Sequence, residues 1–188
     1  MLYNESYTET MKRIDKIDFV LTDPPYPDYL ADEYLYHDGI IDFLKTIPCK
    51  QLIFWTAKEN FPLDYTAIHI WDKITGAACA YERVFERNGG ARYKLYRGHR
   101  INSTVSAQFA RDTFQDHPSQ KPLALIRKMI LEYTKEGDTV FDPFAGSGTT
   151  AVACLKEKRK FIGAEINKKY FDNAMKRIEY AQSQTSLF

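Results

Sequence analysis

The chain has 188 residues, with 26 basic and 25 acidic side chains and a formal net charge of +1. Hydrophobic residues make up 44% and charged residues 27% of it, which is ordinary for a globular domain and excludes wholesale disorder or a fibrous repeat. Its apolar runs are far shorter than the roughly 20 residues of a membrane-spanning helix. We therefore expect one domain over residues 1–188 and no membrane partner.

The three cysteines are widely spaced and form no CxxC pair: Cys49, Cys79 and Cys154. Their number and spacing predict neither a disulfide framework nor a thiolate zinc site, so we expect no bound metal. The first residues lack the charged-then-apolar pattern of a secretion signal. These features together favour a reducing, cytoplasmic setting.

The first half of the chain alternates between strand and helix patterns. Strands are expected at residues 2–4, 17–22, 51–56 and 67–71, and helices at 8–13 and 34–47. Directly after the second strand, Asp23-Pro24-Pro25-Tyr26-Pro27 cannot be helix or sheet interior, because three prolines remove three donors and fix φ. The sequence thus predicts a rigid loop at the carboxyl end of a strand.

The middle of the chain carries a weaker pattern. Short strands near residues 80–85 and 91–96, joined by Asn88-Gly89-Gly90, are expected to form a hairpin. Around them, Glu86 is the single acid among interleaved rings and seven basic residues: Arg83, Arg87, Arg92, Lys94, Arg97, Arg100 and Arg111. Such a stretch suits a nucleic-acid surface, since cations neutralise phosphate and rings stack on bases, but a hairpin with a solvated arginine face explains it equally well.

The last third returns to clear alternation. Helices are expected at residues 123–133, 149–158 and 168–182, and strands at 139–142 and 160–165. Strands alternating with helices predict a parallel sheet covered on both faces, in which ligands bind beyond the carboxyl ends of the strands. The loops that begin at Asp23 and Asp142 both fall at that edge.

The glycine-rich loop indicates a nucleotide-like cofactor. Gly146-Ser147-Gly148 lies between a strand and a helix, where the backbone can approach a ligand closely. Glu165 ends the next strand, where an acid can accept hydrogen bonds from both hydroxyls of a ribose. An adenosine-bearing cofactor fits, but Gly146-x-Gly148-x-x-Ala151 also matches a dinucleotide fingerprint, and a tight turn with no ligand explains the glycines too.

The Asp23-Pro24-Pro25-Tyr26 loop suits attack by a conjugated amine. Asp23 and the Pro24 carbonyl can each accept one N–H of an exocyclic amino group and aim its lone pair at an electrophile. Tyr26 offers a face on which a base can stack, and a base must leave the duplex to reach such a pocket. The alternative is a proline-rich turn with an exposed acid.

Three segments together resemble the signatures of the amino-group DNA methyltransferases, in the order of their β class: Asp23-Pro24-Pro25-Tyr26, His117-Pro118-Ser119-Gln120-Lys121-Pro122 and Phe141-Asp142-Pro143-Phe144-Ala145-Gly146-Ser147-Gly148-Thr149-Thr150. This family uses S-adenosylmethionine to methylate adenine N6 or cytosine N4. The resemblance implies a Rossmann-like α/β methyltransferase sheet with circularly permuted motifs. Residues 76–115 would be a small target-recognition insert, and the short chain resembles the solitary enzymes of phages and prophages.

The resemblance also implies a role for each motif residue. Asp23, Pro24, Pro25 and Tyr26 would hold the target base. The cofactor would be bound by Asp142, Pro143, Phe144, Ala145, Gly146, Gly148 and Thr149, with Glu165 on the ribose and Ser119 and Lys121 near the methionine carboxylate. Family members often carry a Gly-Asp pair after the N-terminal strand, where this chain has Asn4-Glu5, so Glu5 would substitute. DNA would be contacted by Arg92, Lys94, Arg97 and Arg100.

The expected reaction is methylation of adenine N6 on a base flipped out of double-stranded DNA. A loop led by Asp and containing Tyr is more usual for adenine, and one led by Ser for cytosine, so cytosine N4 is the alternative. A methyltransferase acting on RNA or on protein glutamine, and a non-catalytic DNA-binding remnant of the family, also stay open. A homodimer is compatible with the resemblance.

Overall fold

The computed structural model describes residues 1–25, 38–74, 80–90, 92–98 and 120–185. Their strands form one eight-stranded sheet in the order β1-β8-β7-β2-β3-β5-β4-β6. The strands are β1 (Leu2–Tyr3), β2 (Phe19–Thr22), β3 (Lys50–Trp55), β4 (Ala67–Asp72), β5 (Tyr81–Arg87), β6 (Leu95–Arg97), β7 (Thr139–Asp142) and β8 (Lys160–Ala164). The helices are α1 (Tyr7–Met11), α2 (Asp38–Thr46), α4 (Leu123–Tyr133), α5 (Thr149–Lys156) and α6 (Lys168–Thr185).

The sheet is mostly parallel, which confirms the predicted α/β class. Only β5 runs against its neighbours, β3 and β4. The expected hairpin at Asn88-Gly89-Gly90 is wrong, because β5 lies between β3 and β4 and both of its edges are already paired. The strand that follows the turn, β6, adds instead to the outer edge of β4, in parallel.

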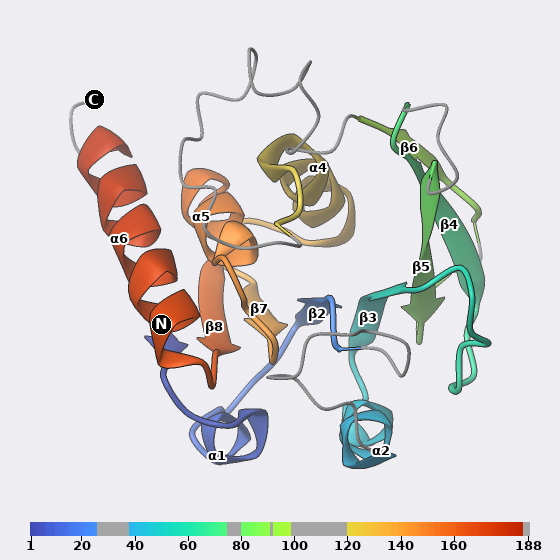
Figure 1. The fold of residues 1–188 in the computed structure, drawn as a ribbon, viewed down its shortest axis with the longest axis horizontal. Helices are drawn as coiled ribbons and strands as arrows, with labels where there is room; N and C mark the ends of the chain where they lie inside the picture. The colour runs from blue at the N-terminus through green and yellow to red at the C-terminus, as the bar shows by residue number, and fades with distance from the viewer. Residues whose placement is uncertain (26–37, 75–79, 91, 99–119, 186–188) are drawn as a thin grey trace.

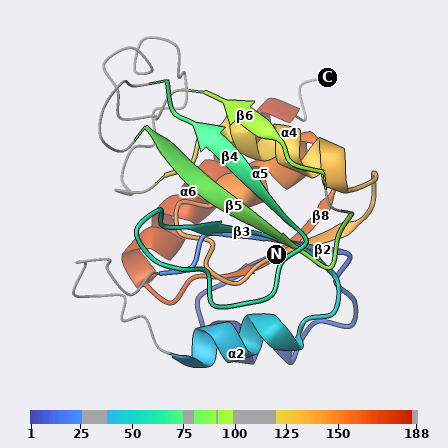
Figure 2. The ribbon, with the colours of Figure 1, turned by 90° about the vertical axis from the view of Figure 1, so that its right-hand side faces the viewer.

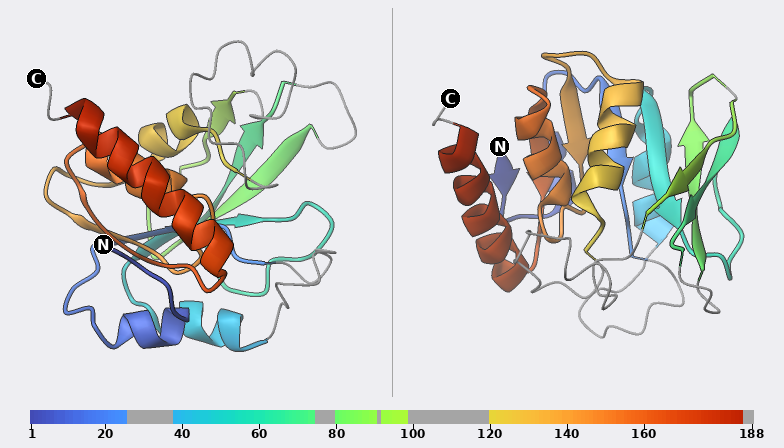
Figure 3. Two further views of the ribbon diagram at one scale, coloured as in Figure 1. Left: turned by 60° about the vertical axis from the view of Figure 1, so that its left-hand side comes forward. Right: turned by 90° about the horizontal axis from the view of Figure 1, so that it is seen from above.

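Helices cover both faces of the sheet, with α4, α5 and α6 on one side and α1 and α2 on the other (Figure 1). The views from other sides show the same three layers (Figures 2 and 3). Alternate residues of β2 supply the two cores: Phe19 and Leu21 pack into the cluster with α4 and α5, whereas Val20 packs beside Ile47 and Phe141. Among the helices that the structure describes, none combines the length and apolarity needed to cross a bilayer.

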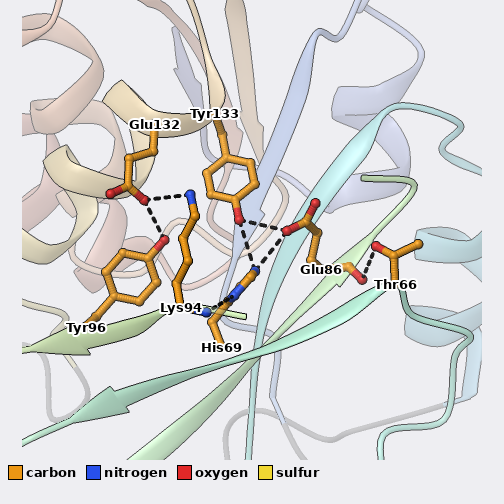
Figure 4. A network of polar contacts seen from close by, with 7 residues as sticks. All are labelled: Thr66, His69, Glu86, Lys94, Tyr96, Glu132 and Tyr133. Carbon is orange, nitrogen blue, oxygen red and sulfur yellow. Dashed lines mark hydrogen bonds and ion pairs between the residues drawn. The ribbon is translucent and has the colours of Figure 1, made fainter. Parts of the chain in front are cut away.

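A network of hydrogen bonds and ion pairs connects β4, β5 and β6 to α4 (Figure 4). Glu86 Oε2 accepts a hydrogen bond of 2.7 Å from the Tyr133 hydroxyl and lies 2.9 Å from His69 Nε2. The backbone N–H of Lys94 donates to His69 Nδ1, so Nε2 carries the proton and donates to Glu86. Burial lowers the pKa of His69, which keeps the ring neutral in the core. The network anchors the sheet edge that carries the predicted DNA-binding residues.

Candidate active site

The two unusual loops leave neighbouring strands at the same edge of the sheet. β2 and β7 pair in parallel, with Phe19 opposite Val140, and end at Thr22 and Asp142 respectively. Asp23 follows Thr22 directly, with Pro24 buried beside it and Pro25 half-buried. The structure therefore brings the beginning of the proline-rich loop next to the glycine-rich loop, as the sequence predicts.

The Asp142 side chain is bonded within the protein. Its Oδ1 accepts hydrogen bonds from the Thr22 hydroxyl (2.9 Å) and the Phe144 N–H (3.2 Å), and its Oδ2 accepts one of 2.7 Å from the Thr150 hydroxyl. Burial raises the pKa of Asp142 to about 6, although these donors oppose the shift. The side chain thus ties the glycine-rich loop to β2 and α5, and its contact with a cofactor stays a prediction.

The glycine-rich loop needs its glycines. Gly146 and Gly148 have φ of +50° and +72°, in the left-handed region that side chains disfavour. A Cβ at Gly148 would lie 3.0 Å from the Cβ of Ala174 in α6. Pro143 and Ala145 are buried in this loop, and the Phe144 ring packs on Tyr7, with ring centroids 5.2 Å apart. Because Gly146 and Gly148 carry no side chain, a ligand can approach the backbone of the loop closely at these two positions.

An arginine that the sequence analysis missed holds this loop from α6. Arg177 is 2% exposed, and its Nη1 donates to the Ser147 carbonyl (3.1 Å) and to the Thr149 hydroxyl (2.7 Å). The sequence could have indicated its burial, because Arg177 falls between Ala174 and Ala181 on one face of the helix. A basic residue on an apolar face needs buried hydrogen-bond partners.

The predicted ribose acid lies against the glycine-rich loop. Glu165 follows β8 and is buried. Its Oε2 accepts a hydrogen bond of 2.8 Å from the Gly146 N–H, and its Oε1 accepts one of 2.8 Å from the Asn167 N–H. Glu5, the other acid expected at the cofactor, does not contact the glycine-rich loop through the hydrogen bonds seen here. Its carboxylate accepts hydrogen bonds of 3.0 Å from the Thr10 hydroxyl and from Arg13 Nε. Glu5 faces α1 in this structure, and its role toward a cofactor stays a prediction.

Lys121 joins the two loops. Its ammonium donates to Asp23 Oδ2 and lies 3.4 Å from Glu82 Oε2, while its carbonyl accepts from the Thr149 hydroxyl at 3.3 Å. Burial alone would lower the pKa of Lys121, but the carboxylates of Asp23 and Glu82 raise it above its ordinary value. The lysine that the resemblance placed near the methionine carboxylate thus contacts the carboxylate of the proline-rich loop here.

Three of the predicted DNA-binding residues, Arg92, Lys94 and Arg97, lie in or just before β6. Arg92 and Arg97 are exposed, and Arg97 Nε lies 3.3 Å from Asp72 Oδ2. The Lys94 ammonium donates a hydrogen bond of 2.9 Å to Glu132 Oε2. Two arginines of the same basic stretch are used inside the protein: Arg87 is 4% exposed and donates to the Leu44 carbonyl, and the half-buried Arg83 donates to the carbonyls of Thr56 and Glu59. Tyr26, Ser119 and Arg100 lie outside the described residues.

The sheet order and the two adjoining loops define a Rossmann-like methyltransferase fold. Residues 50–176 match the family model described as DNA methylase, and the chain belongs to this family of amino-group (N6 and N4) methyltransferases. The family predicted from the three motifs is therefore confirmed.

Curated relatives match parts of the chain. It is 43% identical over 74 residues to the DNA adenine methyltransferase YhdJ of Escherichia coli (strain K12), which is 39% of this chain and 25% of that protein. It is 40% identical over 93 residues to the orphan methyltransferase M.BamHII of Bacillus amyloliquefaciens, which is 48% of this chain and 33% of that protein. The chain thus aligns with a quarter to a third of the length of these relatives.

Solved structures share the fold over nearly the whole chain. The M1.HpyAVI–SAM complex superposes with a TM-score of 0.63 at 22% identity, covering 95% of this chain and 98% of that one. The PvuII DNA methyltransferase (cytosine-N4-specific) superposes with a TM-score of 0.68 at 17% identity, covering 97% and 89%. At these identities the likeness establishes the fold.

Proposed function

We propose that the protein transfers a methyl group from S-adenosylmethionine to N6 of an adenine that has left a DNA duplex. The observation that carries the proposal is the junction of the two loops, made by Thr22 with Asp142 and by Lys121 with Asp23. Membership of the DNA methylase family and a relative named as a DNA adenine methyltransferase support it.

The residues of the glycine-rich loop fit the cofactor. Two glycines with positive φ let a ligand approach the backbone of this loop closely, and the Glu165 carboxylate beside Gly146 is the acceptor for the ribose hydroxyls. Gln120 is 9% exposed, and neither of its side-chain amide atoms forms a hydrogen bond within the described residues, so a polar group remains to be bound beside Lys121. When bound, S-adenosylmethionine supplies an electrophilic methyl group.

The residues of the proline-rich loop hold and orient the amino group. Asp23 and the Pro24 carbonyl accept its two N–H groups, which directs the nitrogen lone pair toward the electrophile. The two prolines restrict the backbone, so less ordering is needed at the moment of reaction. The Lys121 ammonium fixes the direction of the Asp23 carboxylate. Tyr26 is proposed to stack on the base.

Adenine is favoured over cytosine because the loop begins with Asp. Incubation with tritium-labelled S-adenosylmethionine and duplex DNA, followed by nucleoside mass spectrometry, tests this directly. We expect N6-methyladenine in the wild type and loss of transfer in Asp23→Ala, with cofactor affinity by calorimetry largely unchanged. If the product is N4-methylcytosine, cytosine rather than adenine is the target base. If the wild type binds the cofactor but methylates neither base, the protein is a DNA-binding remnant of the family.

DNA is proposed to lie against the β6 edge, on Arg92, Lys94, Arg97 and Arg100. Replacing Arg92 and Arg97 by Gln should weaken binding and flatten its dependence on salt, because fewer counterions are released from the phosphates. A matched pair on the other side of the molecule, Lys12→Gln with Lys16→Gln, should leave the salt slope unchanged.

We also propose that the enzyme is cytoplasmic and that it can form a homodimer. Sedimentation of the free protein tests the homodimer.

A further inference from the structure

Four charged side chains of alternating sign run from the sheet into the proposed base-binding loop. Asp23 receives the Lys121 ammonium, Lys121 lies 3.4 Å from Glu82 Oε2, and Lys73 Nζ lies 2.6 Å from Glu82 Oε1. They come from four separate places: the loop after β2, the segment before α4, strand β5 and the segment after β4. Glu82 and Lys73 belong to none of the three motifs.

This row of charges is largely shielded from water. The side chains of Lys73 and Lys121 are 5% and 11% exposed, and those of Glu82 and Asp23 are 21% and 23% exposed. The Glu82 carboxylate is balanced by Lys73 at Oε1 and by the Lys121 ammonium 3.4 Å from Oε2, and Oε2 is buried and accepts no hydrogen bond within the described residues. Because an unbalanced buried charge is costly, Glu82 and Lys121 hold each other in place.

The surroundings of Lys121 explain why one carboxylate is not enough. Besides Asp23 and Glu82, the ring of Phe54 on β3 lies 5.0 Å from its ammonium, and Lys73 faces it across Glu82. Asp142 on β7 adds a further carboxyl group near Asp23. Two carboxylates from separate elements, the loop after β2 and strand β5, hold the ammonium between them, whereas Asp23 alone would tie it to a single loop.

We propose that Glu82 is a positioning residue for methyl transfer, which with Lys73 fixes the Lys121 ammonium and through it the direction of the Asp23 carboxylate. The inference rests on the proposed function, because the value of a fixed Asp23 lies in orienting the amino group of the base. Glu82 does not touch the substrate in this scheme. Its effect reaches the reaction through Lys121.

The carboxylate charge and the side-chain size of Glu82 can be separated by two variants. Glu82→Gln keeps the size and removes the charge, whereas Glu82→Asp keeps the charge and shortens the side chain. A positioning role through Lys121 predicts that kcat falls about tenfold or more in Glu82→Gln and much less in Glu82→Asp, with KM for the cofactor unchanged. A purely structural role predicts the reverse order, with Gln tolerated better than Asp.

The contact with Lys121 is tested without any activity. Lysine labelled with ¹³C at Cε gives one signal per lysine, and the Lys121 signal is the one missing from Lys121→Met. Loss of the Glu82 carboxylate should lower the pKa of Lys121, so its titration moves to lower pH in Glu82→Gln. The control is Asp72→Asn, which removes a carboxylate of β4 that pairs with Arg97 instead, and its Lys121 titration should match the wild type.

The outcomes separate this inference from the proposed function. A Lys121 titration that is the same in Glu82→Gln and the wild type overturns the inference, whatever the activity. A shifted titration with unchanged kcat overturns the positioning role. If the wild type transfers no methyl group to DNA, the proposed function fails, whereas the titration still decides whether Glu82 governs Lys121.

Discussion

The Thr22 hydroxyl donates a hydrogen bond of 2.9 Å to Oδ1 of Asp142. Thr22 is the last residue of β2 and Asp142 the last of β7, and they are 2% and 4% exposed. Because Asp23 follows Thr22 directly, this contact sets the spacing between the proline-rich and glycine-rich loops in a region that water does not reach. The two loops are therefore fixed to one another at their roots.

This contact predicts an unusual dependence of stability on pH. Burial raises the pKa of Asp142 from 3.8 to about 6, so its contribution to stability is fully present below pH 3.8 and is lost as pH rises through about 6. Asp142→Asn removes this loss and keeps an oxygen for Thr22. The free energy of unfolding of the variant relative to the wild type should therefore rise by roughly 2 kcal/mol between pH 4 and pH 7.

Asp18→Asn is the matched control, because the pKa of Asp18 is shifted in the other direction. Hydrogen bonds from Lys16 and from the Thr139 N–H hold that pKa below its ordinary value, so Asp18 contributes stability above pH 3.8 that is lost as pH falls. The Asn variant should thus become relatively less stable as pH rises. Denaturant titrations of the three proteins at several pH values measure both trends, and a flat difference for Asp142→Asn would contradict the burial argument.

Strong local patterns made much of this fold predictable from the sequence. The apolar periodicity of residues 123–133 corresponds to α4, and the β-branched and aromatic run at 17–22 contains β2. Loops rich in proline or glycine indicated where the strands before them end, because proline restricts the backbone angles and glycine permits unusual ones. The proximity of Asp23 and Asp142 followed from one rule, that parallel strands end at the same edge.

Contacts between distant segments were not predictable in this way. Asn88-Gly89-Gly90 has the composition of a hairpin turn, but sheet order is decided by which edges are already paired, and β5 was paired on both. Glu82 carries no local signal of function, and the apolar stripe around Arg177 indicates that it is buried without indicating its partner. Their partners, Ser147 and Lys121, lie tens of residues away, so only the folded arrangement reveals them.

Arg177 is expected to control cofactor binding through the glycine-rich loop. Arg177→Met keeps much of the side-chain volume but removes the donors to the Ser147 carbonyl and the Thr149 hydroxyl. Hydrogen bonds from a charged group contribute about 1.5–3 kcal/mol, so we expect S-adenosylmethionine to bind about tenfold more weakly, as measured by calorimetry. Lys176→Met, the same change at the exposed neighbouring residue, should leave the affinity unaltered; equal losses in both variants would rule out the loop contact as the cause.

Tyr133 is expected to stabilise the edge of the sheet. Tyr133→Phe removes the 2.7 Å hydrogen bond to Glu86 Oε2 while keeping the ring, which stacks on Phe19. A donor lost from a buried carboxylate costs about 1–3 kcal/mol, and urea denaturation measures it. Tyr93→Phe serves as the control because Tyr93 is 78% exposed, and its stability should match the wild type within error.

Gly148 is expected to tolerate no side chain. Its φ of +72° costs an L-residue roughly 1–2 kcal/mol, and a Cβ would meet that of Ala174 at 3.0 Å, closer than two packed methyl groups approach. Gly148→Ala should therefore lose stability in thermal unfolding and displace α6 relative to the glycine-rich loop. Gly90→Ala is the matched control, because a Cβ there would meet no atom of the described residues within 4 Å and the φ of Gly90 is not positive. It should be neutral or gain a few tenths of a kcal/mol from a less flexible unfolded chain. Equal melting temperatures for the two alanine variants would mean that α6 does not press on the loop at Gly148.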